Sequence, residues 1–143
     1  MAAVKEKISK VLKNHHFAVL ATVTTDKKPK PWVRYVFVNS DKDFNLWFAS
    51  FKDSRKVIQI KKNPEVHLTL GVDSSDEMGN YLQIQGKAKL ITDKKTLKSK
   101  WHKDWANYFK GPEDPNYSII SVKPYRIEFV TMKGAEVWEA KKV

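Results

Sequence analysis

A serine, an arginine and a lysine follow one another at Ser54, Arg55 and Lys56, directly before a short helical pattern. Asp53 or Ser54 can cap this helix, which places the two cations in its first turn. Two cations are mildly unfavourable there, because the helix dipole already makes that end positive. A phosphate dianion reverses the balance, since free amides, the Ser54 hydroxyl and both cations can bind it together. The alternative is that both cations are solvated surface residues.

A third cation, Arg34, interrupts the apolar stretch WVRYVFV at residues 32–38. Burying a charge within such a strand is costly unless the charge is paired or lies at the mouth of a barrel. An edge strand whose arginine faces water is the alternative. A basic residue on one strand and a basic helix start after the next strand can bind the same anion, which favours a phosphate site.

Apolar alternation places these residues on a mainly β fold. We expect strands at residues 17–23, 32–38, 44–48, 66–70, 81–91 and 118–131, and a short last strand ending near Trp138. Three helical patterns interrupt them: an N-terminal one, one from Ser54 to Asn63, and one that carries Leu97, Trp101, Trp105 and Tyr108 on a single face. Gly86 is expected to mark a bulge. Short connections without a βαβ rhythm predict a β-barrel of six to seven antiparallel strands with short α-helices, as one domain over residues 1–143.

The composition limits the classes of function. The chain has 143 residues, of which 27 are basic and 16 acidic, and its net charge of +11 favours anionic partners. The absence of cysteine excludes disulfides and thiolate chemistry. No apolar run approaches the roughly 20 residues that cross a bilayer, so we expect a cytoplasmic protein with no membrane partner. The histidines lack metal-ligand spacing, so no metal site is predicted.

The aromatic stripe after residue 94 has several interpretations, because lysines surround it. In one interpretation, this basic aromatic helix binds nucleic acid or a membrane face. Packing of the aromatics on the barrel, with solvated lysines, is the favoured interpretation. A third places this segment in the wall of a cofactor pocket or at a dimer seam.

Three stretches in this order resemble the FMN-binding split-barrel superfamily: FAVLATVTTDKKPKPWVRYVFV, NLWFASFKDSRKVIQIKKNPEVHLTL and YLQIQGKAKLI. The branch that they resemble most is that of the pyridoxamine 5'-phosphate oxidase-related general stress proteins. The most specific part is the aromatic strand end followed by Ser-Arg-Lys, an apolar helical turn and Asn-Pro. The resemblance covers about His16 to Phe129 and implies a Greek-key split barrel.

The resemblance also implies a cofactor and its site. FMN would lie at a homodimer interface, with a phosphate site made by Arg34 and the triplet Ser54, Arg55 and Lys56. The ring system would be bordered by backbone groups of one strand and by the end of the next, at Tyr35, Val36, Phe48, Ala49 and Ser50. The partner subunit would reach the cofactor from the strand that carries Tyr81 and Gln83.

The C-terminal segment departs from the oxidase pattern. The Arg-x-His-Asp-Arg substrate signature of the oxidase is absent, and the chain reads YRIEFVTMKGAEVWEAKKV there. Val130 stands where related sequences often carry a tryptophan, and Trp138 is a candidate substitute. We therefore expect a flavin-dependent oxidoreductase that does not make pyridoxal phosphate, with its substrate and catalytic residues open. The alternatives are flavin storage or sensing without turnover, a basic nucleic-acid-binding module, which is the less favoured partner class, and the same barrel with FAD, deazaflavin or haem.

Overall fold

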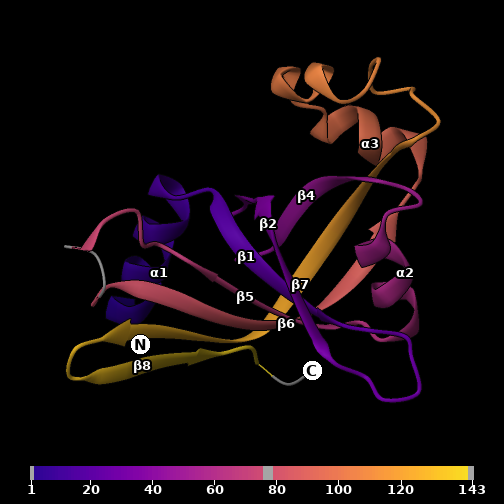
Figure 1. The fold of residues 1–143 in the computed structure, drawn as a ribbon. Coiled ribbons are helices and arrows are strands. Elements are labelled where there is room, and N and C mark those ends of the chain that lie inside the picture. The colour runs from indigo at the N-terminus through magenta and orange to yellow at the C-terminus, as the bar shows by residue number, and fades with distance from the viewer. Residues whose placement is uncertain (1, 76–78, 142–143) are drawn as a thin grey trace.

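The computed structural model describes residues 2–75 and 79–141, and its main feature is one strongly curled antiparallel sheet (Figure 1). The described residues form eight strands: β1 Phe17–Val23, β2 Pro31–Phe37, β3 Asn39–Ser40, β4 Leu46–Phe51, β5 Glu65–Leu70, β6 Tyr81–Ile91, β7 Tyr117–Thr131 and β8 Gly134–Glu139. The helices are α1 Ala2–Asn14, α2 Arg55–Lys62, α3 Lys94–Lys100 and the 3₁₀ helix η2 Lys103–Asn107. The predicted mainly β class is confirmed.

The strand order explains why the sheet curls. It runs β2-β1-β5-β6-β7-β4-β3, with β8 paired to β7. Because β2 ends at Phe37 and β3 begins at Asn39, Val38 alone joins the two ends of this order. The ends must therefore meet, and the Val38 amide donates to the His16 carbonyl at 2.7 Å there. β3 raises the strand number above the expected six or seven. No strand was predicted at Asn39–Ser40, since two residues are too few to show alternation.

The barrel core follows from the alternation of the longest strands. On β6, Leu82, Ile84 and Ala88 face the interior and are buried. The predicted bulge is confirmed, because the β6–β7 register shifts between Gln85 and Gly86. A Cβ at Gly86 would lie 2.7 Å from the Val122 methyl Cγ1, so this position has no room for a side chain.

The N-terminal helix covers one end of the barrel. Val4, Ile8, Val11 and Leu12 of α1 are buried, as their spacing predicts. The helix contacts β7 and β8, and in Figure 1 it lies on the left of the molecule, while α3 lies at the upper right. None of the helices in the described residues combines the length and the apolar character that a membrane span requires.

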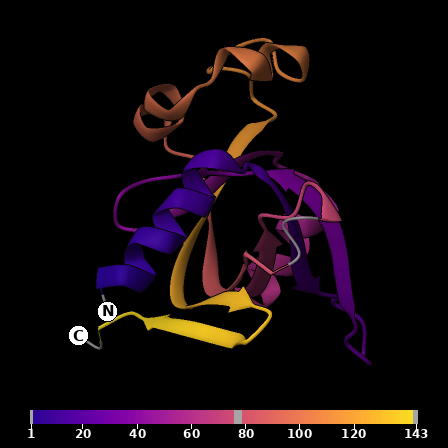
Figure 2. The ribbon, with the colours of Figure 1, turned by 90° about the vertical axis from the view of Figure 1, so that its left-hand side faces the viewer.

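The segment between β6 and β7, residues 92–116, projects from the barrel and is here called the excursion (Figures 1 and 2). The expectation of a single helical face from Leu97 to Tyr108 is wrong, because α3 ends at Lys100 and Trp101 is extended with ψ 132°. Packing decides the local path instead. A second core joins the excursion to the sheet through Leu97, Trp105, Phe109, Tyr117 and Ile119. The favoured interpretation of the aromatics is thus confirmed for Trp105, whereas Tyr108 is 68% exposed.

Candidate functional site

The first turn of α2 leaves backbone donors without helical acceptors. Ser54 occupies the N-cap position, as predicted, but its hydroxyl pairs with the Ser50 hydroxyl at 2.9 Å and caps no amide. The Ile58 amide is bonded to the Ser54 carbonyl, so the amides of Arg55 and Lys56 lie before the first such helical bond. Free first-turn amides of this kind can bind an external acceptor.

Three cations gather beside these amides. Burial lowers the pKa of Arg34, and the nearby Arg55 lowers it further. The pKa of Lys56 is lowered in the same way, first by burial and then by Arg34. Within residues 2–75 and 79–141, no carboxylate forms an ion pair with any of the three. A cluster of mutually repelling cations at a helix start is a site that an anion would stabilise.

A buried polar pair holds the arginine of this cluster. The Nη1 atom of Arg34 donates to the Thr22 hydroxyl at 2.7 Å, and Nη2 donates to Gln59 Oε1 at 3.0 Å. Thr22 on β1 and Gln59 on α2 are only 2% and 4% exposed. These bonds offset the cost of a charge within an apolar strand. Sequence reasoning missed both partners, since a threonine in a strand and a glutamine in a helix carry no signal of their own.

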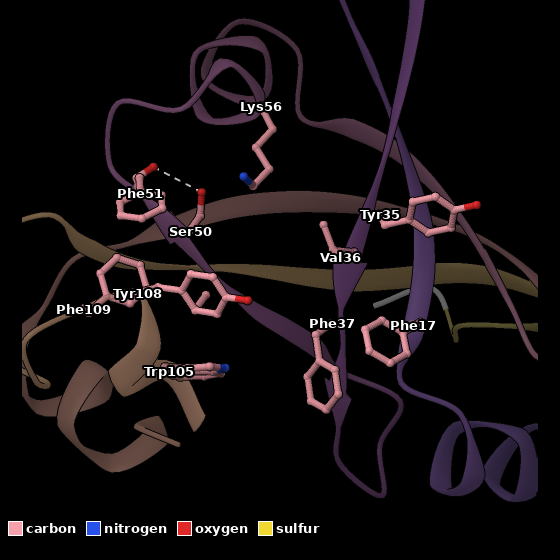
Figure 3. Close-up of a pocket in the computed structure, with 11 residues that line it drawn as sticks. Phe17, Tyr35, Val36, Phe37, Ser50, Phe51, Lys56, Trp105, Tyr108 and Phe109 are labelled. Carbon is pink, nitrogen blue, oxygen red and sulfur yellow. Dashed lines mark hydrogen bonds between the residues drawn. The ribbon is translucent and has the colours of Figure 1, made fainter. Parts of the chain in front are cut away.

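A groove of about 300 Å³ opens next to the cations (Figure 3). Five of the predicted site residues line it: Tyr35, Val36, Ala49, Ser50 and Lys56. The side chain of Lys56 extends toward it, while the Tyr35 ring points away from the other lining residues. Phe48, also predicted, is 1% exposed and belongs to the barrel core. The groove therefore has a cationic end between β2 and the start of α2.

Aromatic side chains form most of the remaining wall. The lining residues that sequence reasoning did not assign to the site are Phe17, Phe37, Phe51, Trp105, Tyr108 and Phe109. The Tyr108 ring points into the groove in Figure 3, and Phe51 and Phe109 are in contact with ring centroids 4.7 Å apart. The excursion thus supplies one side, which agrees with its interpretation as a pocket wall. This aromatic wall makes the groove largely apolar, so the groove suits a planar ring system.

Tyr81 and Gln83 lie away from this groove in the same chain. They start β6, whereas Ile91 at its other end packs with the excursion's core. Neither residue is among those that line the groove of its own chain. Trp138 is also separate, because its ring packs edge-on against Phe44 at 5.1 Å beside the core.

Comparison with known proteins agrees with this fold. Residues 4–131 match the family described as Pyridoxamine 5'-phosphate oxidase. The chain is 34% identical over 128 residues to General stress protein 26 of Bacillus subtilis strain 168, which covers 89% of this chain and 88% of that protein. Among solved structures, General Stress Protein 26 from Bacillus anthracis is 28% identical with a TM-score of 0.81, covering 96% of this chain and 98% of the other.

A more distant structure shares the fold alone. It is described as a pyridoxamine 5'-phosphate oxidase-related, FMN binding protein from Nostoc punctiforme. It is 14% identical, has a TM-score of 0.67, and covers 98% of this chain and 90% of its own.

Proposed function

Because this chain belongs to the pyridoxamine 5'-phosphate oxidase family, we propose that it binds FMN and acts as a flavin-dependent oxidoreductase. The observation that carries the proposal is the cluster of Arg34, Arg55 and Lys56 beside free amides, with no carboxylate ion-paired to any of them among the described residues. The FMN-binding description of the Nostoc punctiforme protein is consistent with it.

The residues present fit this cofactor in two respects. FMN combines a phosphate with a planar ring, and the site combines a cationic end with an aromatic groove. Arg34, Ser54, Arg55 and Lys56 would hold the phosphate, and the groove between β2 and β4 would take the ring. When bound, the flavin supplies the redox chemistry, while the chain orients it and excludes water. The missing oxidase signature argues for a substrate other than pyridoxamine phosphate.

The outer face of β2 suggests how the site is completed. Val33 and Tyr35 are 60% and 79% exposed, and the neighbouring Phe17 is 69% exposed. Large apolar side chains exposed together on one strand are typical of an interface. We therefore include in the proposal a homodimer with the cofactor at the interface, in which Tyr81 and Gln83 serve the groove of the other subunit.

The test compares two flavins that differ only in the phosphate. Wild-type protein should bind FMN more tightly than riboflavin in a fluorescence titration. The double variant Arg55→Ala/Lys56→Ala should lose about 100-fold in FMN affinity, since two charged hydrogen bonds contribute about 3 kcal/mol together. The matched control, Lys61→Ala/Lys62→Ala at the other end of α2, removes the same charge and should change FMN affinity little.

Two results would contradict the proposal. One is no binding at micromolar FMN, together with a visible spectrum of the purified protein that shows no flavin. The other is an equal loss of FMN and riboflavin affinity in the Arg55→Ala/Lys56→Ala variant. The same spectrum separates flavin from haem or deazaflavin. Turnover is tested by adding candidate electron donors, NADH and NADPH among them, without oxygen, because bleaching of the flavin absorbance shows that a donor reduces the flavin.

A further inference from the structure

The hydrogen bonds of Arg34 occupy only one side of its guanidinium group. Nη1 donates to the Thr22 hydroxyl, and more weakly to the carbonyls of Leu20 at 3.2 Å and Trp32 at 3.1 Å. Nη2 donates to Gln59 Oε1. Within residues 2–75 and 79–141, Nε makes no hydrogen bond, and only one of the two Nη2 protons has an acceptor.

The geometry of guanidinium shows which edge remains. The Thr22 hydroxyl donates to the same Gln59 oxygen, so the two acceptors of Arg34 are in contact with each other. Adjacent acceptors must lie at the edge between Nη1 and Nη2. The unused protons, on Nε and Nη2, are therefore parallel to each other on the next edge. This is a fork that matches two oxygens of one phosphate group.

Three separate elements fix the arginine in this orientation. Arg34 lies on β2, Thr22 on the neighbouring β1 and Gln59 on α2, whose first turn carries the other two cations. The register pairs Arg34 with Leu20, so Thr22 sits two residues further along the adjacent strand. Both partners are buried, so water does not compete for these bonds. Arg55 differs, because its guanidinium lies over the Trp32 ring at 5.2 Å.

We propose that Thr22 and Gln59 are positioning residues, which hold one edge of Arg34 so that the other edge binds a phosphate with two hydrogen bonds. This inference rests on the proposed function and assigns different roles to the three cations. Arg55 and Lys56 supply charge, which any anion satisfies. The fixed fork of Arg34 supplies geometry, and it adds to the preference that these charges give the site for a phosphate ester over an unphosphorylated flavin.

The test removes one acceptor at a time and measures the ratio of FMN affinity to riboflavin affinity. Thr22→Val keeps the shape but loses the hydroxyl, and Gln59→Leu removes the second acceptor. Each should lower the ratio about tenfold, the effect of one charge-assisted bond. Thr22→Ser restores the hydroxyl and should restore the ratio. The matched control is Thr69→Val, which removes a strand hydroxyl bonded to the Leu82 carbonyl and should leave the ratio unchanged.

A second readout follows the arginine itself. The Nε–H resonance of Arg34 in a ¹⁵N-edited NMR spectrum should shift when wild-type protein is titrated with FMN or with inorganic phosphate. In Thr22→Val this shift should be much smaller. If Gln59→Leu does not fold, as judged by circular dichroism, the Thr22 series decides alone.

The outcomes separate this inference from the proposed function. A wild-type protein that shows no preference for FMN over riboflavin overturns both. A wild-type preference for FMN whose size is unchanged in Thr22→Val overturns the inference only. Equal losses of FMN and riboflavin affinity in Thr22→Val, without a change in their ratio, would show that Thr22 is merely structural and would also overturn it.

Discussion

Replacing Tyr117 by phenylalanine should weaken the attachment of the excursion to the barrel. Tyr117 begins β7, is 0% exposed, and its hydroxyl donates to the Leu97 carbonyl of α3 at 2.9 Å. Its ring also contacts Trp101 and Phe109, at 5.2 Å in both cases. Because Trp105, Tyr108 and Phe109 of the excursion form one wall of the groove, this hydroxyl helps to fix the shape of the candidate site.

The structure allows a magnitude to be assigned. Tyr117→Phe removes one buried donor and leaves the Leu97 carbonyl without that partner, which should lower the free energy of unfolding by about 1–3 kcal/mol. Tyr108→Phe is the matched control, since Tyr108 is 68% exposed and should tolerate the change within about 0.5 kcal/mol. Urea unfolding measures both. Amide hydrogen exchange should show the loss of protection concentrated in α3 and η2.

The same side chain predicts a dependence on pH. Burial raises the pKa of Tyr117 from 10.0 to about 12 in the folded protein. The contribution of the neutral Tyr117 hydroxyl to the free energy of unfolding is therefore complete below pH 10. It is lost as the pH rises toward 12, because this tyrosine ionises at a lower pH in the unfolded chain. Two pH units correspond to about 2.7 kcal/mol at most. The advantage of wild type over Tyr117→Phe should shrink or reverse across this range. Equal unfolding free energies for Tyr117→Phe and Tyr108→Phe at pH 8 would refute the reasoning.

Three further predictions concern the cofactor, the core and the interface. FMN affinity should rise between about pH 5 and 7, because the phosphate, with a second pKa near 6, becomes a dianion. It should fall again at a pH below the ordinary lysine range, because the pKa of Lys56 is lowered. Fluorescence titrations should show no such profile for riboflavin. Gly86→Ala should lower the free energy of unfolding by about 1–3 kcal/mol through overpacking, whereas Gly111→Ala, with no atom within 4 Å of the new methyl, should change it little in urea titrations. Tyr35→Glu should yield a folded monomer by light scattering, and a dimer of unchanged mass would contradict the proposed interface.

Alternation along long strands was sufficient to predict most of the sheet. The strand over residues 81–91 was predicted with the bounds that β6 has, and Gly86 stands at its bulge. On β2, Val33 and Tyr35 face outward and Val36 faces the core, as period two requires. The helical spacing of Trp101 and Trp105 misled the prediction, because tertiary packing around Tyr117 overrides the local periodicity.

The part of the site that a sequence motif carries was predictable, whereas the part that tertiary packing assembles from distant residues was not. Lys56, Tyr35 and Val36 line the groove, as the motif implies, while the role of these residues in cofactor binding stays a prediction. Phe51 and Phe109 meet across the two ends of a connection longer than 50 residues, which no local pattern reveals. Gln59 is buried on α2, where its Oε1 accepts hydrogen bonds from Arg34 and Thr22, and no local pattern in the helix reveals these two donors.

The single residue between β2 and β3 has a consequence for the versatility of the scaffold. Val38 joins the two ends of the strand order through the backbone. The barrel is therefore closed although β2 and β4, which flank the groove, share no ladder of hydrogen bonds. A flat molecule can slide between these strands without breaking a pair of the sheet. Side chains along this opening can also be exchanged without disturbing the register elsewhere. The paired strands that folding requires are therefore separate from the opening between β2 and β4, where side chains can change to suit a new ligand.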